Sequence, residues 1–129
     1  MPKILVIDDD ESFRDYMMFL LERNGYEAVC LRGGGRALAA IGAQHFDAIV
    51  TDLYMPEADG IEIIRTAKEA MPTVPILGVT GGYRGLNDPC SKAMVSLGAN
   101  AVFTKPLDAS AFLRTLRDAL PPAMRKGVE

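Results

Sequence analysis

The stretch Ile4-Leu5-Val6-Ile7-Asp8-Asp9-Asp10 decides the expected fold of this chain. Its apolar part is short and mostly β-branched, which is typical of a strand buried on both faces. The carboxylates end the apolar run, and Glu11–Asn24 then carries apolar residues at helical spacing. Gly25 ends that pattern, as a glycine just past a helix does. The chain is therefore expected to begin with a buried strand, a polar loop and an amphipathic helix.

The same alternation of short apolar runs and helical patterns continues along the whole sequence. We expect strands at Lys3–Ile7, Glu27–Leu31, Asp47–Thr51, Ile76–Val79 and Ala101–Thr104. We expect helices at Glu11–Asn24, Arg36–Ala43, Gly60–Met71, Pro89–Leu97 and Asp108–Leu120, with a break at Gly33-Gly34-Gly35. In the first helix, the apolar spacing predicts that five residues face inward: Phe13, Tyr16, Met17, Leu20 and Leu21.

Buried strands that alternate with helices predict an α/β protein whose parallel sheet is covered on both faces. Right-handed crossovers leave few topologies. The natural candidate is a flavodoxin-like, doubly wound, five-stranded parallel sheet of order 2-1-3-4-5 with five helices. We expect one domain over residues 1–121 and a short C-terminal tail over 122–129. Because Met1 directly precedes the first strand, a complete single-domain protein is favoured over a piece of a longer one.

Composition excludes several classes of function. The chain has 129 residues, of which 49% are hydrophobic and 24% charged, as in an ordinary soluble domain. A net charge of −3 argues against nucleic-acid binding by phosphate neutralisation. No apolar run approaches the ~20 residues of a membrane span, and the acidic residues after Ile7 do not fit a signal peptide, so we expect a cytoplasmic protein. Cys30 and Cys90 are expected to be reduced thiols, and His45 is the only histidine.

Polar residues sit at the carboxyl ends of four predicted strands. Asp8 and Asp9 follow the first strand and Asp52 the third, while Thr80 and Lys105 follow the fourth and fifth. Ligands of doubly wound sheets bind at this edge, near the point where the strand order reverses. The first and third strands are neighbours there, so the three aspartates should converge.

Two interpretations of the acidic run remain open on its chemistry. Converging carboxylates repel one another unless a cation lies among them, and an all-oxygen ligand set suits Mg²⁺ or Mn²⁺. Alternatively, acidic residues cap the start of a helix. Asp10 or Glu11 alone could supply that cap. Capping explains neither the pair Asp8 and Asp9 nor the distant Asp52.

The sequence resembles the receiver domain of two-component response regulators, from about Lys3 to Leu120. Each matching segment alone is a weak signal, but four in this order and at compatible spacing are specific. The segments are Ile4–Asp10, Ile49–Pro56 with Asp59-Gly60, Pro75–Thr80, and Phe103–Leu107. Each segment lies on a predicted strand end.

The resemblance implies a phosphorylation site. Asp52 would be the phosphoacceptor, and Asp9, Asp52 and the backbone carbonyl of Tyr54 would ligate Mg²⁺ directly. Asp8 would act mainly through metal-bound water. Mn²⁺ could replace Mg²⁺.

The resemblance also implies how the phosphoryl group is held and supplied. Thr80 would offer its hydroxyl to the phosphoryl group, and Lys105 would neutralise one of its oxygens, with Lys105-Pro106 in the cis form. The phosphodonor would be a sensor histidine kinase or a histidine phosphotransfer protein, and phosphorylation would switch the binding of an unidentified output protein. Such a receiver is a phospho-switch that catalyses only its own phosphorylation and dephosphorylation; no direct nucleic-acid contact and no membrane insertion are expected.

One position departs from the family pattern. Many receivers carry an aromatic residue three positions before the lysine, where this chain has Val102, and Phe103 should face the opposite side of the strand. In such receivers the aromatic side chain moves inward as the threonine moves, and with Val102 at that position no ring can do so. We therefore expect the signal to pass through the glycine-rich loop Gly81–Gly85, which contains Tyr83.

Three other functions compete with that of a receiver. A pseudo-receiver that takes no phosphate is opposed by the intact set of acidic, threonine and lysine residues. A metal-dependent phosphohydrolase usually carries a second acid two residues after its nucleophile, where this chain has Tyr54. A flavin carrier is disfavoured because the acids at Asp8–Glu11 would repel the flavin phosphate.

Overall fold

The computed structural model describes residues 1–55, 58–81 and 89–124. Its strands form one sheet in the order β2-β1-β3-β4-β5, and all neighbouring strands are parallel. The strands are β1 (Lys3–Ile7), β2 (Glu27–Leu31), β3 (Ala48–Asp52), β4 (Ile76–Thr80) and β5 (Ala101–Thr104). The helices are α1 (Glu11–Arg23), α2 (Gly34–Ala43), α3 (Gly60–Ala70), α4 (Pro89–Ser96) and α5 (Ala109–Ala119). The predicted flavodoxin-like α/β fold is therefore confirmed.

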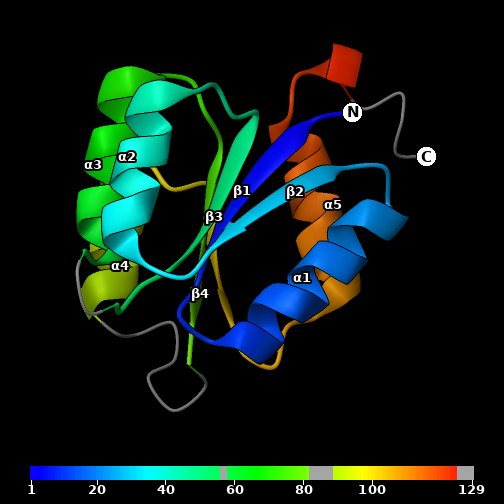
Figure 1. The fold of residues 1–129 in the computed structure, drawn as a ribbon, viewed down its shortest axis with the longest axis horizontal. Coiled ribbons are helices and arrows are strands. Elements are labelled where there is room, and N and C mark those ends of the chain that lie inside the picture. Colours follow the sequence, from blue (N-terminus) through cyan, green and yellow to red (C-terminus); the bar gives the residue numbers. More distant parts are fainter. Residues whose placement is uncertain (56–57, 82–88, 125–129) are drawn as a thin grey trace.

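The helices cover both faces of the sheet. Figure 1 shows α2, α3 and α4 on one face and α1 and α5 on the other. Alternate residues of the central strands point into the two layers: Leu5 and Ile7 pack beneath α2 and α3, whereas Ile4 and Val6 pack beneath α1 and α5. These strand residues are fully buried. The apolar run Ile4–Ile7 of β1 is thus explained by a core on each side.

Aspartate side chains start three of the helices. Asp10 accepts a hydrogen bond from the backbone N–H of Ser12, Asp59 from that of Glu62, and Asp108 from that of Ala111. Each bond satisfies a backbone donor that the first helical turn leaves free. Asp10 therefore serves as the cap of α1, which leaves Asp8 and Asp9 without a capping role.

Helix α2 starts earlier than predicted. The sequence suggested a break over Gly33-Gly34-Gly35, but the helix begins at Gly34 with Gly33 as its N-cap. A side chain at Gly34 would bring its Cβ within 2.5 Å of both the Cβ and the carbonyl oxygen of Ala58. The glycine therefore permits close packing of α2 against the segment before α3, and it does not mark a loop.

Two strands extend one residue further than predicted, to Asp52 and Thr80. Asp52 pairs in register with Val79, and Thr80 pairs with Thr104. The side chains at these positions are consequently placed by the sheet itself. Among the described residues, no helix is both long and apolar enough to cross a membrane.

Candidate functional site

Three aspartates from two neighbouring strands meet at the carboxyl edge of the sheet. One carboxylate oxygen from each of Asp8, Asp9 and Asp52 lies within 4.8 Å of the others. Asp8 is buried, Asp9 is exposed and Asp52 is half-buried. The order β2-β1-β3 makes β1 and β3 neighbours, which brings the first and third strand ends together as the sequence predicted.

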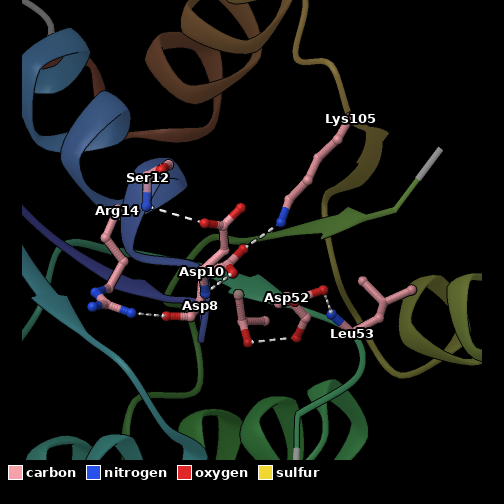
Figure 2. Close-up of polar contacts among 8 residues, drawn as sticks. Asp8, Asp10, Ser12, Arg14, Asp52, Leu53 and Lys105 are labelled. Atoms are coloured by element: carbon pink, nitrogen blue, oxygen red, sulfur yellow. Dashed lines mark hydrogen bonds and ion pairs between the residues drawn. The ribbon is translucent and has the colours of Figure 1, made fainter.

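Asp8 is the most constrained of the three. Its Oδ1 accepts a hydrogen bond of 2.9 Å from the backbone N–H of Asp10, and its Oδ2 accepts one of 2.8 Å from Nζ of Lys105. Its backbone carbonyl accepts a 2.9 Å bond from Nη1 of Arg14. Figure 2 shows these partners converging on Asp8 from α1 and from the end of β5. Asp8 is therefore a buried charge held by a cation and a backbone donor, as buried charges must be.

Asp52 lies beside this pair, in surroundings that disfavour the ionised form of its carboxyl group. Burial, and then the negative charge of Asp8, raise the pKa of its carboxyl to about 6, although Lys105 and the backbone N–H groups of Leu53 and Tyr54 act in the lowering direction. Its Oδ1 accepts a 2.8 Å bond from the N–H of Leu53 (Figure 2). A carboxylate that resists ionisation in this way is one whose surroundings favour an added cation.

Thr80 and Lys105 come from the two strand ends beyond Asp52. The Thr80 side chain is fully buried, and its hydroxyl has no hydrogen-bond partner among the described residues. The backbone N–H of Lys105 donates to the carbonyl of Thr80 at 2.9 Å, which joins the ends of β4 and β5. The peptide bond Lys105-Pro106 is cis, as expected. The site thus combines three acids, one cation and one unsatisfied buried hydroxyl.

Phe13 is a neighbour of the site that sequence reasoning did not assign to it. Nζ of Lys105 lies 4.3 Å from the centre of the Phe13 ring. The helical spacing placed Phe13 on the inward face of α1, and it is indeed packed against the core. The same pattern was wrong for Tyr16, which is 40% exposed. The available signal was that a helix begins directly after the acidic loop, because the first turn of that helix, which contains Phe13, must lie close to the loop.

The position that departs from the family pattern faces α4. Val102 lines a recess of about 310 Å³ with Ser91, Lys92 and Val95. Phe103 instead packs on Phe112 of α5 at a ring-centre distance of 5.6 Å. Phe103 therefore faces the opposite side of the sheet from Val102, as expected. The predicted signalling loop lies largely outside the described residues, because Gly82 to Gly85, and with them Tyr83, fall in the gap between 81 and 89.

The acidic cluster has the composition of a hard-cation site. All its candidate ligands are carboxylate oxygens, and the histidine and both cysteines lie elsewhere in the chain. This donor set suits Mg²⁺ better than zinc or copper. Tyr54, 37% exposed, follows Asp52 by two residues at this edge.

Comparisons with known proteins place the whole fold in one family. The family model described as the response regulator receiver domain matches residues 4–117. The chain is 32% identical over 98% of its length to the alkaline phosphatase synthesis transcriptional regulatory protein PhoP of Bacillus subtilis, of which it covers 55%. It is 35% identical over 86% of its length to the CAI-1 autoinducer sensor kinase/phosphatase CqsS of Vibrio cholerae, of which it covers 16%.

Solved structures agree with this assignment. A CheY-like response regulator receiver domain protein from Methanospirillum hungatei has a TM-score of 0.82 at 29% identity, with 92% of each chain covered. The chemotaxis response regulator CheY4 of Vibrio cholerae has a TM-score of 0.81 at 28% identity, with 93% of this chain and 99% of that chain covered. The chain therefore belongs to the response regulator receiver domain family and is a phospho-switch domain of two-component phosphorelay signalling.

Proposed function

We propose that this domain accepts a phosphoryl group on Asp52 in a Mg²⁺-dependent reaction, and that phosphorylation switches its binding to an output protein. The observation that carries the proposal is the convergence of Asp8, Asp9 and Asp52 beside Lys105 and the unsatisfied hydroxyl of Thr80. The donor would be the phosphohistidine of a sensor kinase or of a histidine phosphotransfer protein. The reaction would take place in the cytoplasm.

The metal would be held by oxygen ligands. Asp9, Asp52 and the backbone carbonyl of Tyr54 would bind Mg²⁺ directly, and Asp8, whose two oxygens already have partners, would act mainly through metal-bound water. Mn²⁺ has the same ligand preferences and could substitute. When bound, the cation supplies positive charge that offsets the charge on the phosphoryl oxygens. The raised pKa of Asp52 supports this assignment, because a cation would favour the ionised form.

The chain's own residues account for the remaining chemistry. A carboxylate oxygen of Asp52 forms a bond to phosphorus while the bond from phosphorus to the donor's imidazole nitrogen breaks, and the imidazole keeps that electron pair and takes up a proton. Lys105 then neutralises a phosphoryl oxygen. The hydroxyl of Thr80 donates a hydrogen bond to another phosphoryl oxygen. That bond would satisfy a group whose burial without a partner costs about 1 to 3 kcal/mol.

The same arrangement limits the protein to acting on itself. The position two residues after Asp52 is Tyr54 and not a second acid, so no side chain there can activate water for rapid turnover. We infer that dephosphorylation is a slow reaction of the domain's own aspartyl phosphate. The phosphorylated form would then persist long enough to bind its output partner.

Labelling with a small phosphodonor tests the proposal. Acetyl phosphate should label the protein in the presence of Mg²⁺ but not with EDTA, and the label should be released by hydroxylamine. Peptide mapping should place it on Asp52. Asp52→Asn should abolish labelling. Asp59→Asn is a matched control, because Asp59 only caps α3 and asparagine caps equally well.

Two outcomes would reject the assignment. Labelling of Asp52→Asn at the wild-type level would place the phosphate on another residue. A wild-type protein that takes no label in Mg²⁺, while its fold is intact by circular dichroism, would favour a pseudo-receiver that binds partners without phosphorylation.

A further inference from the structure

The ammonium group of Lys105 has two neighbours, an acid and an aromatic ring, that attract it in different ways. Nζ donates to Oδ2 of the buried Asp8 at 2.8 Å, and it lies 4.3 Å from the ring centre of Phe13. The first contact is an ion pair. The second is within the ~6 Å range over which an aromatic face attracts a cation. Both partners belong to the start of the chain, whereas Lys105 follows the last strand.

An ion pair alone would leave Lys105 free to leave the site. The lysine side chain is a flexible stem of four carbons, and holding it in one geometry costs conformational entropy. Its side chain is 23% exposed, and it lines an open hollow of about 390 Å³ together with Phe13, Tyr16 and Leu107. The ammonium group could swing into this hollow and be hydrated there. The Phe13 ring lines the same hollow, and its attraction for the cation favours the one position in which Nζ lies 4.3 Å from the ring centre and also reaches Asp8.

The ring itself is fixed by the fold. Phe13 lies in α1, three residues after the N-cap Asp10, and it packs against the core under that helix. The adjacent Arg14 donates to the backbone carbonyl of Asp8, so the helix start and the acidic loop form one unit. The ring therefore keeps a defined position relative to Asp8.

We propose that Phe13 is a positioning residue for Lys105: its ring, together with Asp8, holds the ammonium group over the carboxylates so that it is in place when Asp52 becomes phosphorylated. This inference rests on the proposed function. The role of Phe13 is electrostatic and depends on the face of its aromatic ring. A leucine, which fills similar space without such a face, should not replace it, whereas a tyrosine should.

The rate of phosphorylation gives the first test. With acetyl phosphate and saturating Mg²⁺, Phe13→Leu should label about two- to fivefold more slowly than wild type, and Phe13→Tyr should keep the wild-type rate. Phe19→Leu is the matched control. Phe19 is a second phenylalanine of α1 with Arg23 over its ring at 5.3 Å, and it is not among the residues that line the hollow beside Lys105. Its replacement should leave labelling unchanged.

A double-mutant cycle separates positioning from a structural role. In a Lys105→Met background, which keeps the stem and removes the charge, Phe13→Leu should have no further effect on the labelling rate. A further loss of the same size in that background would show that Phe13 acts on something other than the lysine, and would overturn the inference.

Nuclear magnetic resonance reads the contact without any phosphorylation. In protein labelled with ¹³C-lysine, the Hε protons of Lys105 should be shifted upfield by the ring, and Lys105→Met identifies the signal by removing it. Phe13→Leu should abolish the shift and Phe13→Tyr should retain it. An unshifted signal in wild type would also overturn the inference.

The two proposals fail in different ways. If wild type takes no label, the proposed function is wrong and Phe13 has no part in transfer, although the ring-current shift would still be seen. If wild type is labelled on Asp52 and Phe13→Leu is labelled at the same rate, the inference alone is wrong.

Discussion

Asp52 is the residue whose ionisation the folded protein opposes most clearly. Burial and the nearby Asp8 raise its pKa to about 6, against 3.8 for the group in its ordinary state. The folded protein therefore binds this proton more tightly than the unfolded chain. It follows that stability is lost as pH rises from about 4 to 6, and that the ionised carboxylate destabilises the metal-free fold throughout the range above.

Asp52→Asn should accordingly stabilise the metal-free protein at pH 7.5. The ion pair of the site joins Lys105 to Asp8, so the substitution breaks no pair, and asparagine can still accept from the N–H of Leu53. Because the group is only half-buried, we expect a gain of about 1 to 2 kcal/mol in the free energy of unfolding. Urea titrations in EDTA at pH 7.5 and 4.5 measure it, and the gain should largely vanish at pH 4.5. A variant less stable than wild type at pH 7.5 would contradict this account of Asp52.

At the scale of elements, the start of α2 depends on the absence of one side chain. A Cβ at Gly34 would lie 2.5 Å from the carbonyl oxygen of Ala58, and backbone cannot yield as a flexible side chain can. Gly34→Ala should therefore lower the free energy of unfolding by roughly 2 kcal/mol or more through overpacking. Gly42→Ala, in the same helix with no atom within 4 Å, should be neutral or stabilising by up to about 1 kcal/mol. Equal urea midpoints for the two variants would refute the packing explanation.

The elements also show what the sequence could and could not predict. Strand order, helix order and the convergence of Asp8, Asp9 and Asp52 followed from periodicity and from the shared edge of parallel strands. The start of α2 was missed because a run of glycines signals a loop unless the close approach of a distant residue, here Ala58, is known. The contact between Phe13 and Lys105 was missed for a related reason: apolar spacing shows which helix face turns inward, but it does not show which side chain of another element the ring meets.

At the scale of the whole molecule, stability and site chemistry are separated along the strands. Two apolar layers, one on each face of the sheet, fill the body of the fold. The charged groups of the site lie at the carboxyl edge, where Asp8 and Asp52 repel one another and the charge of Lys105 and two backbone N–H groups compensate in part. The site therefore lowers stability locally, and any ligand that neutralises it should stabilise the whole domain by mass action.

Magnesium and protons should compete for the carboxylate of Asp52, so the stabilisation by magnesium should depend on pH. Mg²⁺ requires Asp52 ionised, and its carboxyl has a pKa of about 6, so the metal binds the predominant form at pH 7.5 and must displace a proton at pH 5. We expect 10 mM Mg²⁺ to raise the free energy of unfolding by about 1 to 2 kcal/mol at pH 7.5 and by less than half as much at pH 5. Urea titrations with Mg²⁺ and with NaCl of equal ionic strength distinguish binding from charge screening. Asp52→Asn should respond weakly at both values of pH, since the carboxylate that couples metal to proton is gone. Equal stabilisation of wild type at pH 5 and 7.5, or an equal effect of NaCl, would show that the metal does not bind through Asp52.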